Sequence, residues 1–157
     1  MNKSFWLVIS ILVGLLVGSY FVWDSYFNDD QAREFERFEK EYVEAMKSDN
    51  YGGKTPQETL DLLISALDKG DVELAAKYFM LDDNLSRDKW IATFQQLKEK
   101  EILDDMAMDL KKAKPNLEDR IDDDDYRFDI KDSNGDTGAR INMQFNTYSR
   151  VWKIESF

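Results

Sequence analysis

Two spacings of apolar residues organise the chain, a helical spacing over its middle and a strand spacing over its last third. Between residues 55 and 79, Leu60, Leu63 and Leu67 recur three and four residues apart, which places them on one face of a helix. Thr55 and Glu58 have the spacing of a capping box, in which each side chain binds a free backbone N–H of the first turn. The pattern therefore predicts a capped helix that starts at residue 56.

Three more helices follow from the same kind of signal. Gly70 is expected to end the first helix and Asp71 to cap the second, whose apolar face would run on to Phe79. Ser86 is expected to cap the third. A fourth is expected over residues 102–113, with Pro115 stopping it.

From residue 126 the spacing of apolar residues changes to two. Tyr126, Phe128 and Ile130 alternate with charged residues, and the segments 139–145 and 151–155 alternate in the same way. The sequence Asp-Ser-Asn-Gly-Asp at 132–136 is typical of a hairpin turn. Three strands in an antiparallel meander are predicted, with helices covering their apolar face. The fold class is thus α+β, with helices packed on a three- to four-stranded antiparallel sheet.

The N-terminal segment is expected to cross a membrane. Phe5–Trp23 carries no charge, and as a helix it would be about 28 Å long, enough for a bilayer core. Lys3 precedes it and Asp24 follows, which favours a cytoplasmic N-terminus and a C-terminal domain outside the cytoplasm. A cleaved signal peptide is the alternative, but the apolar run continues past the point where cleavage would fall. Residues 1–27 are therefore interpreted as a single-pass signal anchor in the cell membrane.

Residues 28–53 are interpreted as a charged amphipathic stalk helix followed by a glycine hinge. Phe35, Phe38, Tyr42 and Met46 form a stripe on this helix. The stripe would pack on the following domain, stand free, or pair with a second copy in a short coiled coil, so an oligomer through the stalk stays open. The paired glycines at 52–53 mark the end of this region, and residues 54–157 would form the folded domain.

Composition excludes several classes of function. The net charge of −11 argues against binding nucleic acid, whose phosphates require a cationic surface. The chain has no His and no Cys, which removes the commonest general base, the commonest metal ligand and all thiol chemistry. No cofactor, metal or catalytic residue is therefore predicted.

A resemblance to a known superfamily rests on two short stretches. The stretch TPQETLDLLISALDKGDVELAAKYF at 55–79 and the closing VWKIESF together resemble the nuclear-transport-factor-2-like superfamily, the cystatin-like α+β cone. The chain is similar in particular to small membrane-anchored bacterial members of unknown function. The resemblance implies a cone with a pocket between its helices and a concave sheet. It also implies, as an alternative function, an isomerase or dehydratase that uses Asp, His or Tyr in that pocket.

Few residues fit such chemistry here. Asp129 and Tyr126 have the right side chains for a base and an oxyanion donor, but strand alternation places them on opposite faces of the sheet. Asp122–Asp125 is interpreted as a solvated acidic loop rather than a cation site. Asp132, Asn134 and Asp136 resemble the start of a calcium loop, but the strand–turn–strand pattern around them favours the hairpin.

A set of large apolar side chains is expected either to line an apolar pocket or to fill the core between helices and sheet. This set consists of Phe79, Trp90, Phe94, Tyr126, Phe128, Met143 and Trp152. The sequence therefore predicts a membrane-anchored, non-catalytic domain that binds a protein partner or a small apolar ligand.

Overall fold

The computed structural model describes residues 31–116 and 123–157. By its internal contacts the chain divides into a unit that ends at Val43 and a compact unit from Glu44 to Phe157. The compact unit thus begins ahead of residue 54, the start expected from the glycines. Residues 31–48 are helical and are called the leading helix below.

The predicted anchor Phe5–Trp23 lies outside the described residues, so it stays a prediction. Within the part of the chain that the structure describes, no helix has the length and apolar character needed to cross a membrane.

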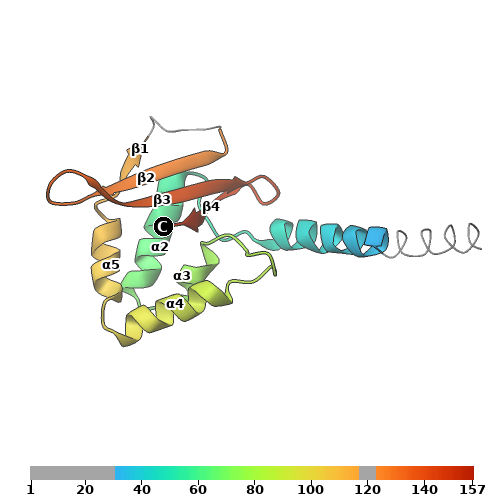
Figure 1. Ribbon diagram of the computed structural model, residues 1–157, viewed down its shortest axis with the longest axis horizontal. Coiled ribbons are helices and arrows are strands. Elements are labelled where there is room, and N and C mark those ends of the chain that lie inside the picture. The colour runs from blue at the N-terminus through green and yellow to red at the C-terminus, as the bar shows by residue number, and fades with distance from the viewer. Residues whose placement is uncertain (1–30, 117–122) are drawn as a thin grey trace, which may run out of the picture. The chain divides into compact units, whose positions relative to one another are not determined.

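Among the described residues of the compact unit, four helices follow (Figure 1). They are α2 (Pro56–Asp68), α3 (Val72–Lys77), α4 (Asp88–Glu99) and α5 (Leu103–Leu110). The capping box of α2 is confirmed, since Thr55 Oγ1 accepts a hydrogen bond from the N–H of Glu58 while the Glu58 carboxylate accepts from the N–H of Thr55. Gly70, with a φ of 64°, turns the chain after α2, and the Asp71 carboxylate accepts from the N–H of Leu74 at the start of α3. Local signals in the sequence therefore located both helices.

Three helix ends differ from the prediction, and one of them is the end of α5, which lies at Leu110 rather than at residue 113. Helix α3 ends at Lys77, so Phe79 lies not on its apolar face but in an extended segment that forms a parallel bridge with Ile154. Helix α4 begins at Asp88 after Arg87, and the Ser86 hydroxyl only accepts from the N–H of Asp88. Helix α3 ends early because Met80 N–H donates to the carbonyl of Ile154 at 2.8 Å, a tertiary contact that replaces the next helical turn.

The sheet has four antiparallel strands in the order β1-β2-β3-β4, which confirms the α+β class. They are β1 (Lys114–Asn116), β2 (Asp125–Lys131), β3 (Thr137–Asn146) and β4 (Val151–Ser156). The three predicted strands correspond to β2, β3 and β4. Strand β1 was not predicted, because Pro115 was expected only to stop the helix over residues 102–113. Pro115 is tolerated there because β1 is an edge strand, where one backbone N–H need not enter the ladder.

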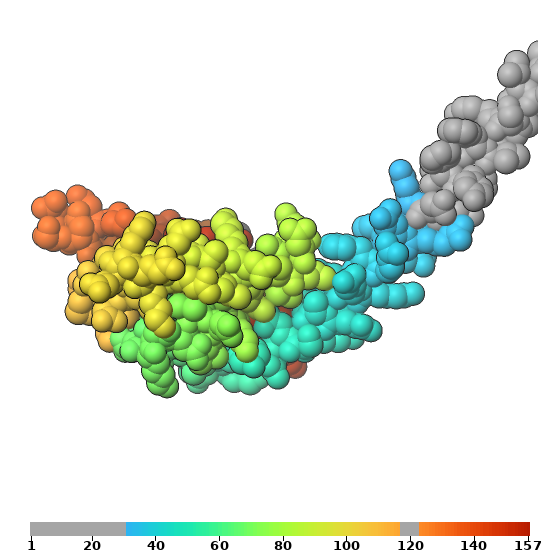
Figure 2. All heavy atoms as spheres, turned by 90° about the horizontal axis from the view of Figure 1, so that it is seen from below, coloured from blue at the N-terminus to red at the C-terminus, as the bar shows by residue number. Residues whose placement is uncertain are grey.

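The helices of the compact unit lie on one side of the sheet (Figure 1). In the view of Figure 2 their atoms cover most of the sheet, while the hairpin between β2 and β3 extends beyond them at one end. The core between the two layers is formed by side chains from both. Its fully buried members include Leu60, Leu63, Leu67, Phe128, Ile141 and Ile154.

The outer edge of β4 is covered rather than open. Trp152 N–H donates to the carbonyl of Gly53, and Ile154 N–H donates to the carbonyl of Tyr78, both at 2.9 Å. Thr59 ties the same edge to α2, because its hydroxyl donates to the carbonyl of Trp152 and accepts from the N–H of Gly53. These bonds remove the unpaired backbone groups that an edge strand would otherwise present.

Candidate functional site

The residues expected to line a pocket or the core lie in packed positions. Phe79 and Phe94 are fully buried, and Phe128 and Met143 are 1 % exposed. Trp152 is buried, and Trp90 and Tyr126 are half-buried against the same core. Side chains thus occupy the space between helices and sheet in which the resemblance places a pocket.

Ring contacts divide these aromatic residues into two groups. Phe79 packs on Trp90 with 4.0 Å between ring centroids and on Phe94 with 5.5 Å. Tyr126 contacts Phe128 at 5.1 Å and Trp152 at 6.0 Å in a separate group. Tilted and edge-to-face arrangements of this kind are typical of a close-packed aromatic core.

Asp129 lies on the other face of β2 and does not meet Tyr126. Its carboxylate accepts hydrogen bonds from Arg140 Nε and from Asn116 Nδ2, each at 2.8 Å. The hydrogen bond from the Arg140 guanidinium holds the pKa of Asp129 below its usual value of 3.8. A carboxylate kept ionised in this way is a poor general base, because a base works best with a pKa close to the ambient pH.

The two acidic segments also have identifiable roles. Asp132 Oδ1 accepts from the backbone N–H groups of Asn134 and Asp136, and Gly135 adopts a φ of 88°, which confirms the predicted hairpin turn. Of the acidic run, Asp122 lies outside the described residues, while the carbonyl of Asp124 accepts from Phe145 N–H at 2.8 Å. Among the residues that are described, no three carboxylates gather as a metal ion would require.

A buried ionic cluster that the sequence did not suggest lies at β4. The side chains of Lys153 and Asp49 are 0 % and 4 % exposed, and Lys153 Nζ lies 2.6 Å from Asp49 Oδ1. The other carboxylate oxygen, Oδ2, pairs with Arg87 Nη2. Arg87 Nε donates in turn to the carbonyl of Phe79 at 2.7 Å. One carboxylate therefore joins two cations from distant parts of the chain.

All three protons of the Lys153 ammonium have an acceptor. Besides Asp49, Nζ donates to the carbonyls of Tyr51 and Lys77, each at 2.7 Å. The neighbouring Asn146 is buried in the same way, with its amide donating to the carbonyl of Met46 at 3.0 Å. The segment from Met46 to Tyr51, part of which was expected to be a hinge, is thus fastened to β3 and β4.

Burial lowers the pKa of Lys153 from 10.5 to about 8, with Asp49 opposing the shift and Arg87 adding to it. A lysine with a lowered pKa is a candidate nucleophile or base when it faces a cleft. The Lys153 ammonium instead donates its three hydrogen bonds to protein acceptors, and its side chain is buried away from solvent. We therefore interpret the cluster as an element that holds the segment before α2 in place.

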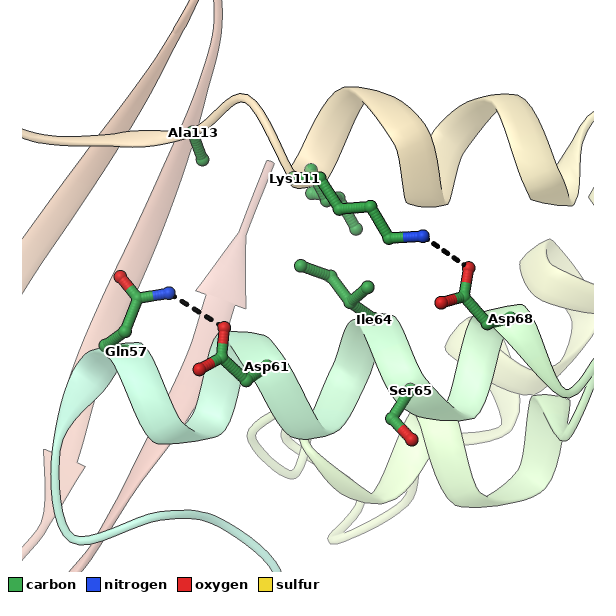
Figure 3. Close-up of a pocket in the computed structure, with 8 residues that line it drawn as sticks. Gln57, Asp61, Ile64, Ser65, Asp68, Lys111 and Ala113 are labelled. Atoms are coloured by element: carbon green, nitrogen blue, oxygen red, sulfur yellow. Dashed lines mark hydrogen bonds and ion pairs between the residues drawn. The ribbon is translucent and has the colours of Figure 1, made fainter.

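Shallow grooves occur on the surface that the described residues of the compact unit form. One, of about 390 Å³, lies between α2 and the end of α5 (Figure 3). Two polar pairs border it, Gln57 with Asp61 at 2.8 Å and Lys111 with Asp68 at 2.9 Å. These side chains are exposed to solvent and pair with one another, so they do not provide a buried ionisable group that could act as an acid or a base.

Two further grooves also open to solvent. One of about 440 Å³ follows the polar face of β2–β4, where Arg127, Gln144 and Glu155 contribute to its lining. One of about 460 Å³ lies beside Gly53 and Leu62. A small apolar ligand is usually held in a concave site that buries most of its surface, which these open grooves do not provide.

Sequence reasoning missed the cluster because its members are far apart along the chain. Asp49 and Lys153 are 104 residues apart. Lys153 alternates with the apolar residues Trp152 and Ile154, a pattern that is usually found in a strand with one solvated face. One signal was available in the sequence. Both faces of this strand carry apolar residues, Val151 on the face of Lys153 and Ile154 on the other, which is typical of a strand buried on both faces.

Comparisons with protein-family models, with curated proteins and with solved structures give no match.

Proposed function

We propose that the chain is a non-catalytic, protein-binding domain anchored in a cell membrane by Phe5–Trp23. In this proposal the N-terminus is cytoplasmic and the compact unit lies outside the cytoplasm. The proposal includes membership of the nuclear-transport-factor-2-like superfamily, which the order of helices followed by an antiparallel sheet supports.

The observation that carries the choice of a protein partner is the packed interior. Phe79, Phe94 and Phe128 fill the space between helices and sheet, and none is more than 1 % exposed. Binding in the interior would require these rings to move, and a close-packed core resists such movement. Binding at the outer surface requires no such change, and the open surface grooves suit a macromolecule better than a small ligand.

An isomerase or dehydratase is the second candidate, since the superfamily contains such enzymes. It would need an acid–base pair directed into one cavity. Asp129 and Tyr126 point to opposite faces of the sheet, and Asp129 is bound to Arg140 and Asn116. This arrangement favours the non-catalytic alternative.

Membrane topology can be tested with the full chain carrying a C-terminal tag. Protease added to intact cells is expected to remove the tag, while a cytoplasmic control protein survives until the cells are permeabilised. A tag that resists protease in intact cells and is digested only after permeabilisation contradicts the proposed location.

The partner can be tested by photocross-linking in the same cells. Cross-linking residues placed at Gln144 on the sheet, at Asp61 on α2 and at Phe38 on the leading helix sample three separate surfaces. Cross-links to a protein at any of them support the proposal. Absence of protein cross-links at all three, or a stoichiometric apolar small molecule retained by the purified chain, contradicts it.

A further inference from the structure

The leading helix carries a stripe of three aromatic side chains, two of which are exposed. Phe35 is 68 % exposed and Phe38 is 48 % exposed, although both are large and apolar. Tyr42 continues the stripe one turn later and stacks on Phe38, with ring centroids 6.5 Å apart and planes 27° apart. The spacing of three and four residues places the three rings on one face. We call Phe35, Phe38 and Tyr42 the aromatic stripe.

Carboxylates border the aromatic stripe on both sides. With about 3.6 residues per turn, Glu34 and Glu41 flank it along one edge and Glu39 along the other. Glu34 lies 3.8 Å from Arg37, but both side chains are 76 % exposed, so this pair leaves the carboxylate available to a partner. The cations of the helix lie on the opposite side. They are Arg33, Arg37, Lys40 and Lys47.

We propose that the aromatic stripe binds an amphipathic helix of another protein, one whose apolar face is bordered by Lys and Arg. Such a helix would lay its apolar residues on Phe35 and Phe38 and set its cations against the flanking carboxylates. The inference rests on the proposed protein-binding function and names the surface and the chemistry of the partner.

A second copy of the chain fits this surface poorly. If Phe35, Phe38 and Tyr42 occupied the seam of a coiled coil, Glu34 of one helix would face Glu39 of the other in a parallel pair. In an antiparallel pair the same edge would place Glu34 and Glu41 against each other. Like charges at these positions oppose pairing, so the flanks select against self-association. An anionic lipid surface is disfavoured for the same reason.

The length of the stripe sets the scale of the interaction. From Phe35 to Tyr42 the helix rises about 10 Å, which gives a small contact typical of weak or transient complexes. An anchored partner in the same membrane would compensate for weak affinity through a high effective concentration.

A binding experiment with synthetic helices tests the inference directly. The full chain is placed in nanodiscs of uncharged phosphatidylcholine and titrated with a stapled leucine helix of about 20 residues whose apolar face is bordered by lysine. Two control helices have glutamate borders or the same composition in scrambled order. We expect the lysine-bordered helix to bind at least tenfold more tightly than either control.

Matched variants of the chain locate the binding surface. Phe35→Ala with Phe38→Ala is expected to weaken binding of the lysine-bordered helix at least tenfold, while Lys40→Ala on the opposite side changes it less than twofold. Both replaced rings are exposed, so circular dichroism should show an unchanged fold. Equal binding by the double variant overturns the inference.

The role of the carboxylates has its own control. Glu34, Glu39 and Glu41 changed together to Gln should weaken binding at least fivefold and reduce its dependence on salt. Glu36→Gln removes a charge of the same kind from the side away from the stripe, and it should change the affinity less than twofold. If the loss of binding free energy per charge removed is the same for the triple variant and for Glu36→Gln, only net charge matters, which contradicts the inference.

The competing occupants are outcomes of further measurements. The chain has no native Cys, so Phe38→Cys reports self-association as a disulfide-linked dimer of the full chain in membranes. Efficient dimer formation would identify a second copy as the occupant. Protection of residue 38 from a water-soluble thiol reagent by phosphatidylglycerol in the nanodisc would identify the membrane. Either result overturns the inference.

Failure of the helix to bind, together with protein cross-links at Gln144 or Asp61, removes this inference and leaves the proposed function standing.

Discussion

The buried cluster at β4 makes a quantitative prediction, because replacing Asp49 by Ala leaves two cations without their shared carboxylate. The Lys153 side chain is 0 % exposed, and the Arg87 side chain is 15 % exposed. Removing one partner of a buried ion pair costs about 3–5 kcal/mol, since an uncompensated charge stays away from water. We therefore expect Asp49→Ala to lower the free energy of unfolding by about 3–5 kcal/mol.

An exposed pair provides the matched control. Lys111 Nζ and Asp68 Oδ1 are 2.9 Å apart, and their side chains are 49 % and 45 % exposed. Because solvent screens such a pair, Asp68→Ala should cost less than about 1 kcal/mol. Urea denaturation of residues 31–157, followed by far-ultraviolet circular dichroism, measures both variants on one scale.

Lys153→Met completes a double-mutant cycle. This change leaves the carbonyls of Tyr51 and Lys77 without their donor but keeps Asp49 paired with Arg87. The double variant Asp49→Ala with Lys153→Met should lose about 2 kcal/mol less than the sum of the single variants. If the two changes add to within about 0.5 kcal/mol, the two groups are not coupled and the interpretation of the cluster is refuted.

The cluster also predicts a dependence on pH. The pKa of Lys153 is about 8 in the folded chain, against 10.5 for an ordinary lysine side chain. Between these values the unfolded state binds more protons, so this group makes the free energy of unfolding rise with pH. The full rise is about 3 kcal/mol. The difference in stability between the wild type and Lys153→Met should therefore increase from pH 7 to pH 10. A decrease would mean that burial is not the dominant effect on the ammonium.

Three further changes probe other parts of the compact unit. Asp129→Ala should lower the free energy of unfolding by about 1 kcal/mol at pH 7, since it removes a carboxylate that binds Arg140. This loss should become smaller as the pH falls below about 4, because a carboxylate with a lowered pKa stabilises the fold only while it is ionised. Thr55→Ala should cost about 1 kcal/mol by removing the cap of α2, and Thr55→Ser should restore most of it. Gly52→Ala should cost about 1–3 kcal/mol or more, because its φ is 152° and a Cβ there would lie 2.3 Å from the carbonyl oxygen of Trp152. Urea denaturation measures all three, and near-neutral effects would contradict the respective contacts.

The predictions from sequence succeeded where the signal is local. The cap of α2 needs only Thr55 and Glu58, and the hairpin needs only the residues at 132–136, so both could be identified from neighbouring residues. The alternation of β2 also placed Asp129 and Tyr126 on opposite faces, as the pairing of the strands confirms. Each of these features depends on backbone geometry over a few residues.

The features that were missed depend on partners distant in the sequence. Strand β1 has no alternation of its own, and it exists because Lys114 and Asn116 pair with β2. Likewise, α3 stops at Lys77 because the next residues pair with β4.

By itself, the sequence determined the order of α2 to α5 and of β2 to β4, the caps of α2 and α3, and the turn between β2 and β3, because short-range sterics and hydrogen bonds decide them. Only the tertiary structure decided which polar residues are buried. Lys153 and Asp49 look solvated in the sequence, and they are tolerated inside because the fold brings them within 2.6 Å of each other. The cost of burying a charge is met only when such a partner is present, and that partner is fixed by the packing of the whole domain.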